Sequence, residues 1–134
     1  MTPTLIDTNI LLDIVTDDPE WADWSIGQMD AAAIGGPIRI NDVVYAELSV
    51  RFAAIEDLDA VLDEAGIGIA SMSRAALFLA GKAFQRYRAS GGSRSGVLPD
   101  FFIGAQAAVS GNRLLTRDRR RYASYFPTVE LVTP

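Results

Sequence analysis

Four acidic residues stand where carboxylates could do chemistry. Asp7 and Asp118 follow short apolar segments, and Asp100 opens another one. The fourth, Glu47, lies in an expected helix. The sequence has no histidine and no cysteine, which excludes imidazole acid–base catalysis, thiolate nucleophiles and thiolate zinc sites. Grouped carboxylates repel one another unless a cation lies between them, and oxygen ligands favour Mg²⁺ or Mn²⁺. We therefore expect a metal site that activates water for attack on phosphorus.

Polar side chains beside these acids could orient the ligands and the water: Thr8, Asn9 and Thr116. Each acid also has an ordinary structural explanation. Asp7, Asp100 and Asp118 could each cap a helix. Glu47 shares a helical stripe with valines, and could pair there with an arginine because an unpaired buried charge is costly. These alternatives stay open, although four unrelated caps and pairs at one sheet edge would be a coincidence.

The chain alternates short apolar segments with helical patterns, which predicts the elements that position these residues. We expect strands at residues 4–6, 38–40, 67–69, 114–116 and 129–132. We expect helices at residues 10–15, 20–34, 42–54, 58–66, 73–88, 99–110 and 118–125. This alternation is typical of βαβ units, so we predict a three-layer α/β fold with a central parallel sheet of about five strands. The length favours a single domain over residues 1–134.

In such a fold the carboxyl ends of the parallel strands meet at one edge of the sheet, where ligands bind. The acidic residues Asp7 and Asp118 follow two of the expected strands, Glu47 lies in the helix after another, and Asp100 opens a helix. We therefore expect the four carboxylates to point toward this edge.

Charge is distributed unevenly along the chain. The formal net charge is −5, and residues 1–66 hold 14 of the 17 acidic residues but only two of the 12 basic ones. Arginines of the second half flank residues 90–96 and Asp118: Arg86, Arg88, Arg94, Arg117, Arg119 and Arg120. Guanidinium groups bind phosphates at two points, so these arginines could bind a polyanion. Alternatively, they pair with the acidic half or are simply solvated.

Several short motifs occur in an order that resembles a PIN domain. They are DTN after the first strand, a glutamate in the third helix, LPDFFIGAQA at a later helix start and LLTRD after a following strand. The length and the closing FPTVELVTP are similar to those of VapC-type toxins of bacterial toxin–antitoxin pairs. The resemblance extends from Leu5 to Pro134.

The resemblance implies an Mg²⁺- or Mn²⁺-dependent endoribonuclease in which Asp7, Glu47, Asp100 and Asp118 are the acids of the metal site. Asn9 and Thr116 would be supporting polar residues. The resemblance also implies a homodimer that a cognate VapB-like antitoxin silences by blocking the site. The arginines named above would then bind the RNA backbone beside the metal site.

Two other functions remain open on the sequence. A phosphatase would have a second aspartate two residues after the first, where this chain has Asn9, and a phosphoacceptor domain would have a lysine after a late strand, whereas Lys82 lies in an expected helix. A catalytically inactive PIN-like binding module would have lost some of the four acids, and all four are present.

The N-terminal residues carry no basic segment ahead of an apolar run, which disfavours a secretory signal. The sequence has no apolar run long enough to span a membrane. We therefore expect a cytoplasmic protein that does not act at a membrane.

Overall fold

The computed structural model describes residues 1–134, with the exception of the side chain of Ser95. It confirms the α/β fold with a parallel sheet between helices. The five strands are β1 (Thr4–Ile6), β2 (Ile38–Asn41), β3 (Ile67–Ala70), β4 (Arg113–Leu115) and β5 (Leu131–Val132). Their order in the sheet is β3-β2-β1-β4-β5, and every neighbouring pair is parallel. The first strand therefore occupies the centre of the sheet.

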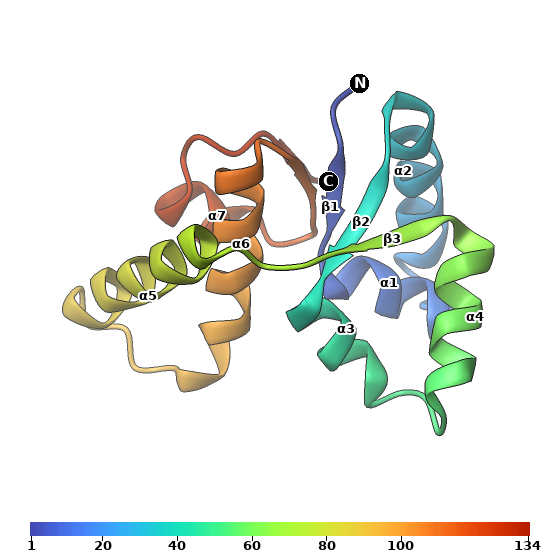
Figure 1. Ribbon diagram of the computed structural model, residues 1–134, viewed down its shortest axis with the longest axis horizontal. Helices are drawn as coiled ribbons and strands as arrows, with labels where there is room; N and C mark the ends of the chain where they lie inside the picture. Colours follow the sequence, from blue (N-terminus) through green and yellow to red (C-terminus); the bar gives the residue numbers. More distant parts are fainter.

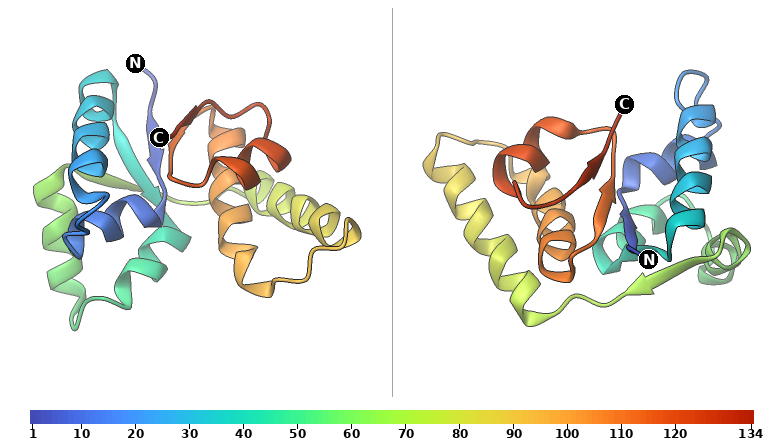
Figure 2. Two further views of the ribbon diagram at one scale, coloured as in Figure 1. Left: turned by 180° about the vertical axis from the view of Figure 1, so that it is seen from behind. Right: turned by 90° about the horizontal axis from the view of Figure 1, so that it is seen from above.

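Helices cover both faces of the sheet. They are α1 (Thr8–Val15), α2 (Ala22–Gly35), α3 (Asp42–Ser49), α4 (Ile55–Ala65), α5 (Arg74–Ala89), α6 (Leu98–Ser110) and α7 (Arg119–Tyr125), with a short 3₁₀ helix at Ser95–Val97. Helices α1 to α4 lie on one side of the sheet and α5 to α7 on the other, as Figures 1 and 2 show from opposite directions. Within the described residues, no helix is long and apolar enough to cross a membrane.

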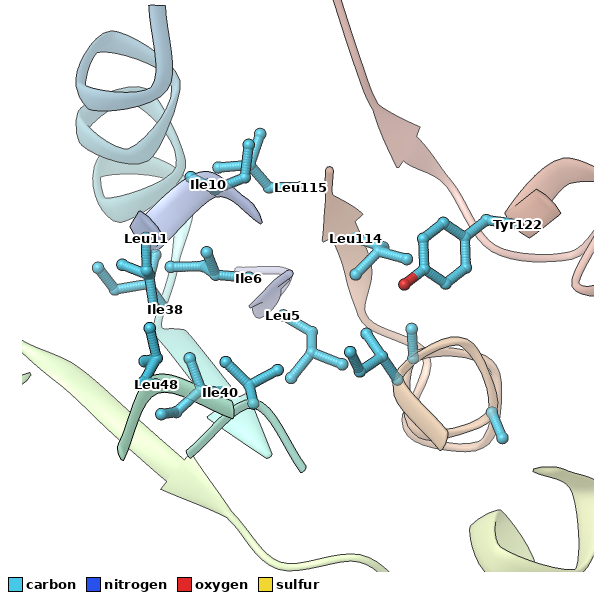
Figure 3. Packing of buried hydrophobic residues seen from close by; sticks show 14 of the residues in the cluster. Leu5, Ile6, Ile10, Leu11, Ile38, Ile40, Leu48, Leu114, Leu115 and Tyr122 are labelled. Atoms are coloured by element: carbon cyan, nitrogen blue, oxygen red, sulfur yellow. The ribbon is translucent and has the colours of Figure 1, made fainter. Parts of the chain in front are cut away.

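The core lies along the central strands. Leu5 and Ile6 of β1 are completely buried, as are Leu114 and Leu115 of β4. Figure 3 shows them between side chains that come from both helical layers. A strand buried on both faces reads as a continuous apolar run, as parallel sheets require, which is why these short strands are visible in the sequence.

One helix is shorter than the sequence pattern predicts. Helix α3 ends at Ser49, well before the expected end at residue 54, and Val50 is 84% exposed rather than packed. The chain turns here so that α4 can bury Leu58 and Leu62 in the core. Long-range packing therefore overrides the local helical pattern. The other elements begin and end within a few residues of their expected positions.

Helix α6 packs unusually closely against its neighbours because one side of it carries small residues. Ala105 and Ala107 are buried, and a Cβ atom added to Gly104 would overlap the ring of Phe126. Gly111 ends the helix in the left-handed conformation, with φ of 65°, which glycine adopts without strain. The close packing fixes the start of α6, which carries Asp100.

We expect Gly104→Ala to lower the free energy of unfolding by about 1–3 kcal/mol, because the added methyl group must displace a packed aromatic ring. Gly81 is the matched control, since it lies inside α5 and a Cβ there meets no described atom within 4 Å. Gly81→Ala should instead raise the free energy of unfolding by up to about 1 kcal/mol, because alanine has a higher helix propensity than glycine. Denaturant unfolding measures both changes, and equal effects would contradict the close contact.

Candidate functional site

The four acids singled out in the sequence line one pocket at the carboxyl edge of the sheet. The pocket has a volume of about 210 Å³, and its lining residues are Asp7, Thr8, Asn9, Leu12, Glu47, Asp100 and Asp118. These residues come from the end of β1, from α1 and α3, from the first turn of α6 and from the start of α7. The parallel topology gathers side chains that lie up to 111 residues apart in the sequence.

Asp7 is the most buried of the four acids, with 4% of its surface exposed. Its Oδ1 accepts a hydrogen bond from the backbone N–H of Thr8 at 2.7 Å, so it does cap α1. Its Oδ2 accepts from the hydroxyls of Thr116 at 2.7 Å and Tyr122 at 3.0 Å. Burial raises the pKa of Asp7 from 3.8 to about 6, and the nearby charge of Asp100 adds to the rise. Asp7 therefore both caps α1 and lines the pocket.

Thr116 and Asn9 connect Asp7 to the segment that carries Asp118. The Thr116 hydroxyl accepts from the backbone N–H of Asp118 at 3.0 Å while it donates to Asp7. Asn9 donates to the Asp7 carboxylate at 3.4 Å and accepts from the backbone N–H of Arg117 at 3.3 Å. These bonds fix the loop after β4 against the start of α1, which supports their predicted role as polar residues at the site.

Glu47 extends from α3 into the pocket and is partly buried. Its Oε1 accepts from the Thr8 hydroxyl at 2.7 Å. The sequence left open an arginine partner for Glu47, but the observed partner is the hydroxyl of Thr8. The valine stripe expected around Glu47 is also incomplete, because Val43 is only partly buried and Val50 lies outside the helix.

Asp100 and Asp118 share one cation. Both carboxylates accept from Nη1 of Arg121, that of Asp118 at 3.4 Å. Asp100 is not a helix cap, since α6 begins at Leu98. Burial raises the pKa of Asp100 above its ordinary value, Arg121 opposes this rise, and the charges of Asp118 and Glu47 add to it. The acids of the pocket therefore interact electrostatically with one another.

Asp118 stands at the N-cap position of α7, but its side chain makes no capping bond in the part of the chain that the structure describes. Its carboxylate is 38% exposed and turns toward Arg121 instead. The capping explanation therefore holds for Asp7 and for neither Asp100 nor Asp118.

The donor set of the pocket suits a hard cation. Among the described residues, no three acidic side chains stand close enough together to form a metal cage as they are arranged. However, all the charged groups that line the pocket are carboxylates, the type of ligand that Mg²⁺ and Mn²⁺ prefer. One carboxylate oxygen each of Glu47, Asp100 and Asp118 has no hydrogen-bond partner among the described atoms. Burial is the main cause of the raised pKa values of Asp7 and Asp100, and repulsion from neighbouring carboxylates adds to both. A cation bound among these acids would relieve that repulsion.

Two residues at this site were missed by the sequence reasoning. Arg121 was not among the arginines singled out in the sequence, although it lies three residues after Asp118, a spacing that could have revealed the pair. Tyr122 reads in the sequence as a core aromatic, and Figure 3 shows its ring in the core with the hydroxyl facing the strands. Burial raises its pKa well above 10, so the hydroxyl stays protonated and donates to Asp7.

Arg117 has a partner inside the protein. Its guanidinium forms two bonds of 2.9 Å with the buried carboxylate of Asp13. It also lies over the ring of Trp21, 5.0 Å from the ring centre. Arg117 therefore fastens the loop after β4 to α1, and its guanidinium is paired inside the protein.

The other arginines expected to bind a polyanion are exposed. Arg120 lines a pocket beside Asp118. Arg119 points to the C-terminal segment and donates to the Thr133 hydroxyl at 3.0 Å. The remaining three, Arg86, Arg88 and Arg94, lie on the last turn of α5 and the segment after it.

The comparisons with known proteins agree with this arrangement. A family profile described as PIN domain matches residues 4–126. Among curated proteins, a sequence comparison gives no match.

Solved structures share the fold over nearly their whole length. A structure of VapBC2 from Rickettsia felis bound to a DNA fragment of its promoter gives a TM-score of 0.76 at 20% identity, covering 98% of both chains. A toxin–antitoxin complex from Klebsiella pneumoniae gives 0.70 at 23% identity, covering 97% of this chain and 96% of the other. VapBC-5 from Mycobacterium tuberculosis gives 0.62 at 21% identity, with both chains fully covered. At these identities the likeness shows the fold.

The raised pKa of Asp7 predicts how its substitution depends on pH in the presence of a chelator. In the unfolded chain Asp7 loses its proton near pH 3.8, and in the folded protein near pH 6. As pH rises across this window, the wild type therefore loses stability relative to Asp7→Asn, by up to about 3 kcal/mol. The measurement is denaturant unfolding of both proteins from pH 3.5 to about 7.5. A difference that does not change with pH would show that burial does not perturb this carboxyl group.

Proposed function

Because the chain belongs to the PIN domain family, we propose that it is a metal-dependent endoribonuclease and that the carboxylate pocket is its active site. One observation carries the proposal: Asp7, Glu47, Asp100 and Asp118, which come from separate elements, line a single pocket at the carboxyl edge of the sheet. Burial and mutual repulsion make this arrangement costly in the absence of a cation. A costly arrangement of this kind favours a catalytic role over a purely structural one.

The four acids are the residues that would hold Mg²⁺ or Mn²⁺. When bound, such an ion supplies positive charge that activates water and stabilises in-line attack on a phosphodiester. Thr116 and Tyr122 orient Asp7 through their hydroxyls, and Thr8 orients Glu47. Ligand carboxylates need such support because their orientation sets the affinity for the ion.

The partners follow from the same proposal. The similar structures described above include toxin–antitoxin complexes, and we propose that a VapB-like antitoxin binds this chain and silences it. We further propose that the chain forms a homodimer and that Arg86, Arg88, Arg94, Arg119 and Arg120 contribute to binding RNA phosphates.

The competing functions fit the site less well. A phosphoacceptor domain needs a lysine at the site, but Lys82 lies in α5 with its ammonium over the ring of Phe78, at 5.3 Å. An inactive binding module would not need four interacting carboxylates in one pocket. Activity of the purified protein decides between the module and the nuclease.

We expect the purified protein to cleave total cellular RNA in the presence of Mg²⁺ or Mn²⁺ and to stop when a chelator is added. Asp100→Asn should reduce the rate by at least about a hundredfold, because it removes a ligand charge. Asp30→Asn is the control, since Asp30 is an exposed residue of α2 that does not line the pocket. Gel analysis of the RNA measures the rates. Equal activity of Asp100→Asn and wild type would refute the assignment of the site.

The products should carry a 3′-hydroxyl and a 5′-phosphate. Water attacks phosphorus, a new P–O bond forms, and the bond from phosphorus to the 3′ oxygen breaks as that oxygen takes a proton. Ligation and phosphatase treatment of the fragments, followed by mass spectrometry, identifies the ends. Fragments with a 2′,3′-cyclic phosphate would mean attack by the ribose hydroxyl, a route that needs no metal-activated water.

A further inference from the structure

A second pocket adjoins the carboxylate pocket and shares Asp118 with it. Its volume is about 280 Å³, and it lies between the last turn of α5 and the outer side of α7. Its lining residues are Tyr87, Asp118, Arg120, Arg121, Ser124 and Tyr125. The two pockets are therefore neighbours that meet at Asp118.

Aromatic rings held in place by the core form one part of this pocket. Tyr87 and Tyr125 lie 6.1 Å apart between ring centres, and both pack on the buried ring of Phe101, at 5.5 and 5.2 Å. The Tyr87 hydroxyl accepts from the backbone N–H of Arg94 at 3.2 Å and therefore keeps its own proton for donation. These rings are rigid and amphipathic, properties that suit stacking and hydrogen bonding to a planar ligand.

Cations form the other part. Arg121 uses Nη1 for Asp100 and Asp118, and its side chain also lines this pocket. Arg120 is exposed at the rim. The pocket therefore offers guanidinium donors beside aromatic rings, directly next to a group of carboxylates.

We propose that this pocket binds the nucleotide next to the scissile phosphate of single-stranded RNA. Tyr87 and Tyr125 would contact the base or ribose, and Arg120 and Arg121 would contact the adjoining phosphate. The proposal rests on the nuclease function proposed above and adds a nucleotide-binding pocket beside the active site.

Two physical arguments support this assignment. A polyanion that reaches four carboxylates needs positive charge close by, and Arg120 and Arg121 supply it at the rim. Aromatic rings beside arginines are the common platform for unstacked bases. A base within a duplex is stacked and paired, so it does not enter such a pocket without being extruded.

The test fills the pocket without replacing any of the four acids. Ser124 is exposed on α7 and lines the pocket, so Ser124→Trp should block it and leave the fold intact. Ala123→Trp is the matched control, because Ala123 is its exposed neighbour and does not line the pocket. Binding of a short labelled single-stranded RNA is followed by fluorescence anisotropy with chelator present. Hydrolysis of methyl 4-nitrophenyl phosphate in Mn²⁺ reports the carboxylate pocket alone.

We expect Ser124→Trp to weaken binding of the single strand by about tenfold, with Ala123→Trp unchanged and hydrolysis of the small diester unchanged in both. Binding of a duplex of the same sequence should not distinguish the two variants. Equal affinity of the two variants for the single strand, or an equal loss with the duplex, would overturn the proposal. A wild type that hydrolyses neither RNA nor the diester refutes the nuclease function, and the anisotropy comparison still decides the nucleotide site.

Discussion

The site depends on one carboxylate buried at the end of the central strand. The parallel register sets Ile6 beside Leu115, so the next residues of the two strands, Asp7 and Thr116, meet and bond. Burial disfavours the charge of Asp7, while hydroxyl and amide donors hold it in place. The fold thus maintains an electrostatic cost at the position where a cation would relieve it, and unfavourable local arrangements of this kind are typical of functional sites.

The basic segment after β4 serves two purposes through two arginines. Arg117 turns toward α1 and neutralises the buried carboxylate of Asp13. Arg121, one helical turn later, turns toward the pocket and contacts Asp100 and Asp118. The uneven charge of the sequence therefore has a mixed explanation. Part of the basic half pairs with the acidic half, and part stays at the site.

The sequence predicts β1 and β4 well because these central strands are short apolar runs that are buried in the core. It also places Asp7 and Asp118 at a sheet edge, since a polar residue after such a run must lie where the strand ends. The strand order, the early end of α3 and the Tyr122–Asp7 bond depend on contacts between distant segments. No local pattern reports such contacts. Arg121 is the intermediate case, because its helical spacing from Asp118 was visible but the contact with Asp100 was not.

In the proposed nuclease, the charge balance of the pocket couples the binding of cation and RNA. Four carboxylates line the pocket, and the described ion pairs join only Asp100 and Asp118 to a cation, Arg121, so an RNA phosphate approaching the four acids would be repelled. A bound cation reverses that repulsion, and linkage requires the phosphate in turn to raise the affinity for the cation. The guanidinium of Arg121 belongs to the same balance, because Asp100 and Asp118 compete with phosphate for it. The affinity for the metal ion measured without RNA is therefore lower than the affinity for the same ion when RNA is bound.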